Sequence, residues 1–305
     1  MKLKRVIAYG CSFTAGEEAG DHEVYEIDEE ELDSKKRSGY TLQSPSDEYI
    51  SFKQKFLKEK YSGKLTDLNI ALLSAGKKYS YVRYLADLLE LPYSNRAVPG
   101  GSLSQMIFRL ERDLYENEVK EGDLVILGLT TPGRFFRLTE LIYNKHVVYR
   151  EYSGVIGTSK LLSQEETNFL LKWDANRIQI IWDYYTSLRH LLMLSEKYKD
   201  KCEIILIPVL CSIGIELEIA MKNLDPETNK INPSVKILFD MCSSLIEHPN
   251  YLQNCFTIPF YNYMILENKG TNNLMHGRRH PKKELHQKYA EYLYTKFIKE
   301  ISENE

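Results

Sequence analysis

The chain has 305 residues, of which 43% are hydrophobic and 27% charged, and its formal net charge is −3. This composition is ordinary for a globular protein with a substantial core, and the charge gives no reason to expect a nucleic-acid partner or an acidic membrane surface. No apolar run approaches the ~18 residues of a membrane span. Its five cysteines lack C-x-x-C spacing, which favours a cytoplasmic protein without disulfides or a zinc site.

The first apolar run of the chain is Val6–Tyr9, which ends at Gly10 and is followed by Ser12. This pattern predicts a buried strand that delivers a serine hydroxyl to the turn beyond it. Such a turn is one way in which an α/β protein presents a nucleophile. It is equally the pattern of a strand-to-helix connection in which Ser12 caps the next helix.

The next part of the chain, residues 17–48, is charged and irregular, and it predicts a surface insertion, either a solvated loop or a lid. Helical spacing then predicts helices over 48–60 and over Tyr79–Leu91. An extended piece and a glycine-rich turn follow, and a further helix is expected over Leu103–Val119. Ser102 is placed to cap that helix.

In the second half of the chain, apolar runs of buried-strand type alternate with helical patterns. The strands are expected at Leu124–Leu129, at Cys202–Val209 and, more weakly, at Asn254–Pro259. Helices are expected over about Gln164–Tyr198 and Lys283–Ile301, and residues 134–165 are interpreted as a second insertion. Alternating strands and helices imply βαβ units and a parallel sheet, whose ligands bind beyond the carboxyl ends of the strands.

A serine nucleophile needs a base, and histidine has the ordinary pKa that fits this task. Of the seven histidines, His280 is singled out because it lies in a loop marked by Gly277 and Pro281, directly before the last predicted helix. His276 is four residues away and could share a metal ion with His280 if the segment were helical. Gly277 and Pro281 argue against a helix there, and no third ligand is evident.

Four short segments lie at predicted strand and helix ends. They are Gly10–Gly16, Asn95–Gly100, Gly128–Thr130 and His280–Pro281. In this order they resemble the four motif segments of the SGNH (GDSL-like) hydrolase superfamily. The resemblance runs from end to end of the chain but leaves out residues 17–48 and 134–165.

The resemblance implies one three-layer αβα domain over residues 1–305, with a parallel sheet of about five strands and insertions at about 17–48 and 134–165. It implies no cofactor and no metal. Ser12 would be the nucleophile and His280 the base, and the amides of Ser12 and Gly100 with the hydroxyl of Thr130 would bind the oxyanion.

The sequence departs from the family pattern at two functional positions. Thr130 stands where the family has an asparagine, and a hydroxyl is a shorter donor that is free to rotate. Gly277 stands where the family has an aspartate three residues before the histidine. The base could therefore be oriented by a backbone carbonyl, by a carboxylate from elsewhere, or hardly at all.

The expected function is hydrolysis of a carboxylic ester, including O-acyl groups on carbohydrates, through an acyl-enzyme on Ser12. The expected partner is a small-molecule or carbohydrate ester. The alternative is a binding protein on the same scaffold that has lost activity, with a carbohydrate or a protein as ligand.

Three local alternatives accompany this expectation. Arg134, Arg278 and Arg279 could bind an anionic substrate group. The pair Gly100-Gly101 could cradle a phosphate, and Cys11 could serve as a thiol nucleophile, although a packed residue is the simpler interpretation.

Overall fold

The computed structural model describes residues 2–37, 47–130, 134–143, 146–155, 177–209 and 280–299, with residue 165 and short pieces between 237 and 250. Contacts between residues divide the chain into two compact units. The first comprises Met1–Cys11 and Arg96–Tyr261, and the second comprises Ser12–Asn95 and Asn262–Glu305. Each unit is described below by itself. The expectation of a single domain over residues 1–305 stays a prediction.

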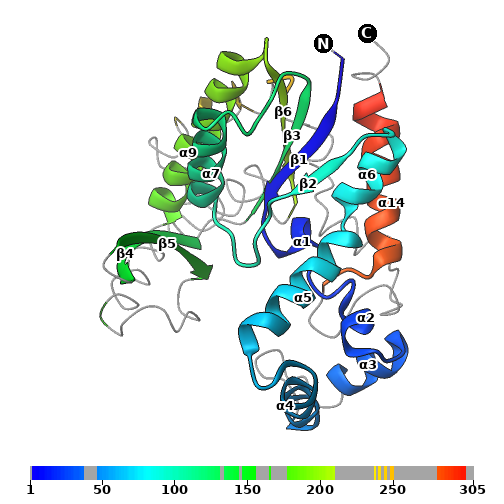
Figure 1. Cartoon of the computed structure of the whole chain (residues 1–305). Coiled ribbons are helices and arrows are strands. Elements are labelled where there is room, and N and C mark those ends of the chain that lie inside the picture. Colours follow the sequence, from blue (N-terminus) through cyan, green and yellow to red (C-terminus); the bar gives the residue numbers. More distant parts are fainter. Residues whose placement is uncertain are drawn as a thin grey trace, which may run out of the picture. The chain divides into compact units, whose positions relative to one another are not determined.

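A parallel sheet flanked by helices confirms the α/β class (Figure 1). Its strands are ordered β2-β1-β3-β6 and comprise Tyr93–Asn95, Arg5–Gly10, Asp123–Leu129 and Cys202–Pro208. The register pairs Gly10 of β1 with Gly128 of β3. The described sheet therefore has four strands where about five were expected, and the weak strand expected at Asn254–Pro259 lies outside the described residues.

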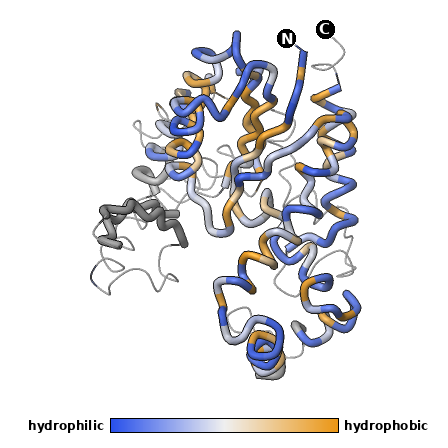
Figure 2. Tube along the Cα trace, viewed as in Figure 1, coloured by the Kyte–Doolittle hydropathy of each residue, from blue (hydrophilic) through white to orange (hydrophobic). Residues whose placement is uncertain are grey.

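Buried apolar side chains hold together β1, β3 and β6, the strands that belong to the first unit, and Figure 2 shows the hydrophobic colour of β3 and β6. All seven residues of β3 are buried, because both faces of a parallel strand are covered. Helices α7 (Leu103–Tyr115) and α9 (Arg177–Tyr198) pack against each other and contribute to the same core as β1, β3 and β6. Each large aliphatic side chain buried in this way contributes about 1.5–3 kcal/mol.

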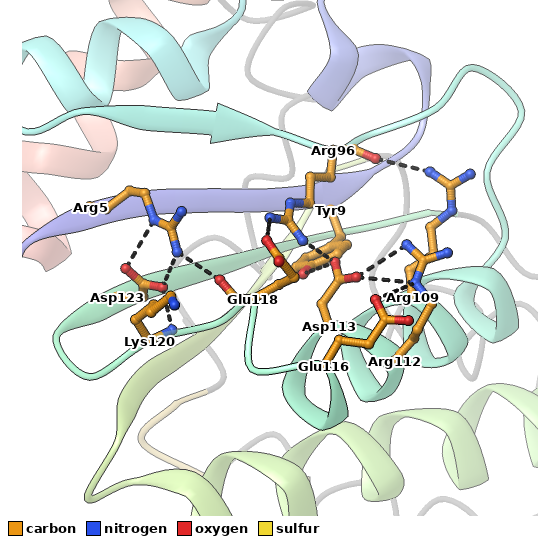
Figure 3. Close-up of polar contacts among 10 residues, drawn as sticks. All are labelled: Arg5, Tyr9, Arg96, Arg109, Arg112, Asp113, Glu116, Glu118, Lys120 and Asp123. Atoms are coloured by element: carbon orange, nitrogen blue, oxygen red, sulfur yellow. Dashed lines mark hydrogen bonds and ion pairs between the residues drawn. The ribbon is translucent and has the colours of Figure 1, made fainter.

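A buried carboxylate, Asp113, connects α7 to the sheet of the first unit (Figure 3). It accepts a hydrogen bond of 2.7 Å from the Tyr9 hydroxyl and further bonds from Arg96 and Arg112. Burial acts to raise the pKa of Asp113, but the bonds from Tyr9 and Arg96 outweigh it and hold that pKa below its ordinary value of 3.8. Burial, with the bond to Asp113, raises the pKa of Tyr9 far above its ordinary range. At neutral pH the network therefore holds an ionised Asp113 and a neutral Tyr9.

A second buried carboxylate, Asp123, fixes the start of β3. It pairs with Arg5 on the neighbouring strand β1 at 2.6 Å and accepts a bond of 2.7 Å from the Lys120 amide (Figure 3). Arg5 also donates to the Glu118 carbonyl at 2.8 Å. These contacts attach the turn between α7 and β3 to the end of the sheet at which β1 and β3 begin.

The second unit is mainly helical in its described part. Its helices are α1 (Ser12–Ala15), α2 (Asp21–Tyr25), α3 (Glu29–Arg37), α4 (Asp47–Tyr61), α5 (Leu65–Lys78), α6 (Tyr81–Leu88) and α14 (Lys283–Leu293), and α14 continues into a π-helical turn, η2 (Tyr294–Ile298). Tyr25 lies at the centre of an aromatic cluster, with ring centroids 5.0 Å from Phe56 and 5.3 Å from Phe52. Elsewhere in this unit, α6 and α14 run side by side.

The interpretation of residues 17–48 as irregular was wrong, since the segment contains the helices α2 and α3. The reason is visible at Asp28, whose carboxylate accepts bonds of 2.8 and 3.3 Å from the amides of Glu30 and Glu31. Carboxylates in the first turn of a helix are favourable because they offset its unpaired N–H groups and its dipole. The acidic run therefore begins a helix. Helix α5 was not expected either.

The second expected insertion, residues 134–165, contains an antiparallel hairpin. Strands β4 (Arg134–Tyr143) and β5 (His146–Val155) pair from Arg134 with Val155 to Tyr143 with His146.

Among the described residues, none of the helices combines the length and apolar character that a membrane span requires.

Candidate active site

Ser12 directly follows the strand β1 and begins the short helix α1, as expected for a residue in a strand-to-helix turn. It is buried, and its carbonyl accepts a bond of 2.9 Å from the Glu17 amide. Its hydroxyl forms no hydrogen bond with any residue that the structure describes. The hydroxyl is therefore not used to cap α1, which was the structural alternative for Ser12.

Asn95 holds the backbone next to Ser12 in place. Its side-chain amide donates to the Thr14 carbonyl at 2.7 Å and to the Ser80 hydroxyl at 3.0 Å. Asn95 was expected only as the first residue of the second motif segment. Within its unit it is a buried structural residue that fixes α1.

The turn after α1 packs against the end of α5 with no space for side chains. A Cβ atom on Gly16 would lie 2.3 Å from the Gly76 carbonyl oxygen, and one on Gly20 would lie 2.5 Å from that of Ala75. Gly16 has φ +73°, a conformation that glycine adopts without strain. Residues between these two glycines are consequently held by close backbone contacts.

His280 has carboxylates of this turn beside both of its ring nitrogens. Its Nδ1 lies 3.3 Å from a carboxylate oxygen of Glu18, and its Nε2 lies 3.6 Å from one of Glu17. The imidazole is 15% exposed, while the side chains of Glu18 and Glu17 are 5% and 31% exposed. The structure does not bring His280 into a hydrogen bond with Ser12, a contact that in free enzymes is often formed only with substrate.

Glu18 was not expected from the sequence, because the family pattern has its acid three residues before the histidine. Glu18 is 262 positions away from His280 in the sequence. The available signal was a pair of carboxylates, Glu17 and Glu18, immediately after the nucleophile segment. The sequence pattern alone did not show that one of them would be buried.

Gly100 and Thr130 belong to the first unit. Gly100 has φ +77°, and its amide has no partner among the described residues, whereas the Gly101 amide donates to the Val98 carbonyl at 2.9 Å. A Cβ atom on Gly101 would lie 2.8 Å from the Gly10 carbonyl oxygen. Of the two glycines, Gly100 therefore keeps a free donor and Gly101 is a packing residue.

Thr130 directly follows β3 and is completely buried, yet its hydroxyl has no partner among the described residues. Buried polar groups in proteins are rarely left unpaired, because an unmade hydrogen bond costs about 1–3 kcal/mol. The Thr130 hydroxyl therefore keeps an unused donor directly after β3, although it is completely buried.

The other residues considered from the sequence have structural roles or lie outside the described part. His286 lies on α14, six residues after His280. It is completely buried, and its ring accepts a hydrogen bond of 3.2 Å from the Tyr81 amide. Cys11 is buried. His276, Arg278 and Arg279 lie outside the described residues, as does the side chain of Arg134. Within the described residues no cluster of three potential metal ligands occurs.

Comparisons with known proteins give distant structural likenesses alone. No protein-family model matches the chain, and no curated protein matches it in sequence. A solved structure of a member of the lipolytic protein G-D-S-L family from Veillonella parvula aligns with a TM-score of 0.41 and 11% identity. The alignment covers 97% of this chain and 99% of that chain. The assignment of a function therefore depends on this chain's own residues.

Proposed function

We propose that the protein is a serine esterase that cleaves a small-molecule or carbohydrate O-acyl ester through an acyl-enzyme on Ser12. The observation that carries this proposal is a set of polar groups without partners. The hydroxyls of Ser12 and Thr130 and the amide of Gly100 have no hydrogen-bond partner among the described residues. These are the three positions for which the resemblance to SGNH hydrolases implies a nucleophile and two oxyanion donors.

In the proposed reaction the Ser12 hydroxyl attacks the ester carbonyl carbon while His280 Nε2 takes its proton. The negative charge that develops on the carbonyl oxygen is stabilised by N–H and O–H donors. The alcohol then leaves with the proton from His280, and an acyl group remains on Ser12. Water attacks the acyl group with His280 again as base, which releases the acid and restores Ser12.

The experiment measures hydrolysis of p-nitrophenyl acetate and p-nitrophenyl butyrate by wild type, Ser12→Ala and His280→Ala. Each substitution is expected to lower kcat by at least about 1,000-fold, because nucleophile and base act as one unit. A fluorophosphonate probe, which reacts with activated serines, is expected to label wild type and to leave Ser12→Ala unlabelled.

Two matched controls remove the same side chains at positions outside the proposed site. The Ser195 hydroxyl donates to the Leu192 carbonyl at 2.7 Å within α9, and His190 pairs with Glu111 at 3.0 Å on the surface. Ser195→Ala and His190→Ala should keep wild-type rates and probe labelling. Hydrolysis that survives both Ser12→Ala and His280→Ala would contradict the proposal, and a wild type that neither hydrolyses these esters nor reacts with the probe would favour a binding protein.

A further inference from the structure

We propose that Glu18 is the carboxylate that positions His280, in place of the acid missing at Gly277. This inference rests on the proposed function, because it assigns a role to Glu18 in the reaction of Ser12. Glu18 touches neither the ester nor the serine in this scheme. It acts through the imidazole and is therefore a positioning residue.

The geometry favours Glu18 over its neighbour Glu17 in three respects. The Glu18 carboxylate is closer to the ring, at 3.3 Å compared with 3.6 Å for Glu17. Its side chain is almost fully buried, at 5% exposed compared with 31%, so that water screens the contact less. It faces Nδ1, whereas Glu17 lies beside Nε2, the nitrogen that exchanges a proton with the nucleophile in the proposed reaction.

The backbone at Glu18 gives independent support. Glu18 has φ +70°, in the left-handed region that residues other than glycine rarely adopt. Holding a non-glycine residue there costs about 1–3 kcal/mol. Such residues occur at functional sites and also at helix ends, as Glu26 does at the end of α2. Glycine would occupy this position without strain, so the position retains a side chain at an energetic cost.

The close packing of this turn makes Glu18 a rigid support. Gly16 and Gly20 lie on either side of it and contact the backbone of α5 at distances that admit no Cβ atom. A group that orients a catalytic side chain must itself be held in place. Backbone contacts hold Glu18 more firmly than a surface loop would.

The chemical role follows from the two nitrogens of the ring. A carboxylate at Nδ1 accepts the Nδ1–H bond and so selects the tautomer in which Nε2 has a free lone pair. When Nε2 takes the proton of Ser12, the ring becomes positively charged, and the carboxylate stabilises that charge. The proton remains on the imidazole and is not passed on to Glu18.

The first test compares Glu18→Gln with Glu17→Gln, which is the same substitution one residue away on the other side of the ring. For p-nitrophenyl acetate, Glu18→Gln should lower kcat by about 100-fold or more with little change in KM, as expected when only the orienting charge is lost. Glu17→Gln should change kcat by less than about 5-fold, since a half-exposed ion pair contributes at most about 1 kcal/mol. A larger loss in Glu17→Gln than in Glu18→Gln would overturn the inference.

A third variant, Glu18→Gly, separates this role from folding. Glycine accepts φ +70° without strain, so that the backbone of Glu18→Gly should fold at least as readily as that of wild type. The variant should nevertheless lose at least as much kcat as Glu18→Gln. Wild-type kcat in a folded Glu18→Gly would contradict the role of Glu18.

The second measurement is independent of activity. Proton NMR of wild type should show a low-field Nδ1–H resonance from His280, because a hydrogen bond to a carboxylate deshields this proton and burial slows its exchange with water. The resonance should disappear in Glu18→Gln and persist in Glu17→Gln. If wild type shows the resonance but hydrolyses no ester, the proposed function fails and the pairing of Glu18 with His280 stands. If the resonance is absent or is lost in Glu17→Gln instead, the inference fails whatever the activity.

Discussion

The Thr130 hydroxyl is buried without a partner among the described residues. Removing it should therefore increase the stability of the protein and decrease its activity. Thr130→Val keeps the shape of the side chain and removes only the polar atom. We expect the free energy of unfolding to rise by about 1 kcal/mol, because an unpaired hydroxyl no longer has to be buried. We expect kcat for p-nitrophenyl acetate to fall by about 100-fold, because one oxyanion donor is lost.

Urea denaturation and steady-state kinetics measure the two effects. Thr14→Val provides the comparison for stability, because Thr14 is equally buried and its hydroxyl lies 3.4 Å from that of Tyr81. Loss of a paired hydroxyl should lower the free energy of unfolding by about 1 kcal/mol. Destabilisation of Thr130→Val to the same degree would show that the Thr130 hydroxyl has a structural partner, and unchanged kcat would remove it from the oxyanion site.

At the residue scale, the sequence points to groups that come from short motifs and not to those defined by burial. Ser12 and His280 are predicted from the sequence because each lies close to a glycine or a proline at an element end. The contact of Glu18 with His280 could not be predicted in this way, because the two residues lie 262 positions apart. A carboxylate becomes an orienting group only when the fold removes it from water, and the sequence pattern gave no measure of that.

The turn between α1 and α2 is the element on which the proposed site depends, and Gly16 and Gly63 allow its packing to be measured. Both have positive φ, of +73° and +79°, but a Cβ atom on Gly63 would have nothing within 4 Å. Alanine at either position should cost about 1–2 kcal/mol for the left-handed backbone. Gly16→Ala should cost a further ~1–3 kcal/mol, because its Cβ would lie only 2.3 Å from the Gly76 carbonyl oxygen.

Thermal and urea unfolding of Gly16→Ala and Gly63→Ala give the difference directly. Gly16→Ala should also lower kcat, because it displaces Glu17 and Glu18, and Gly63→Ala should not. Equal destabilisation by the two substitutions would mean that the turn is not closely packed on α5. In that case the rigid support proposed for Glu18 would be withdrawn.

At the element scale, buried strands were predicted well and the charged helix α3 was not. β1, β3 and β6 appear in the sequence as uninterrupted apolar runs, a pattern that burial on both faces imposes. In α3, by contrast, the acidic residues were interpreted as a solvated loop. Their helix-forming role depends on the capping carboxylate of Asp28, a local contact that a count of charges does not reveal.

At the scale of the whole molecule, stability in acid depends on carboxylates whose pKa values are shifted in opposite directions. The bonds from Tyr9 and Arg96 outweigh burial and hold the pKa of Asp113 below its ordinary value. Burial, by contrast, raises the pKa of Glu203, to which the Asn250 side chain donates at 3.2 Å. Ionised Asp113 therefore stabilises the folded state, whereas ionised Glu203 destabilises it.

The signs follow from which state binds the proton more tightly. Below its ordinary pKa of 3.8, Asp113 is protonated more readily in the unfolded chain. Its contribution is therefore complete above that pH and is lost as the pH falls through the lower folded value. Glu203 is protonated more readily in the folded chain, so its contribution is present below its ordinary pKa of 4.5 and is lost as the pH rises through the higher folded value.

We therefore expect Asp113→Asn to lower the free energy of unfolding at pH 7 by about 2 kcal/mol, since hydrogen bonds to a charged group are lost. The loss should shrink as the pH falls below about 4, because the unfolded wild-type chain then binds a proton at Asp113 that the folded state binds only at lower pH. Glu203→Gln should act in the opposite direction: it should raise the free energy of unfolding at pH 7, and this gain should disappear in acid. Urea titrations of wild type and the two variants between pH 3 and pH 7 measure how each difference in the free energy of unfolding depends on pH. A deficit of Asp113→Asn that stays constant down to pH 3 would mean that the pKa of Asp113 is not lowered by folding, and Tyr9, Arg96 and Arg112 would then contribute packing alone.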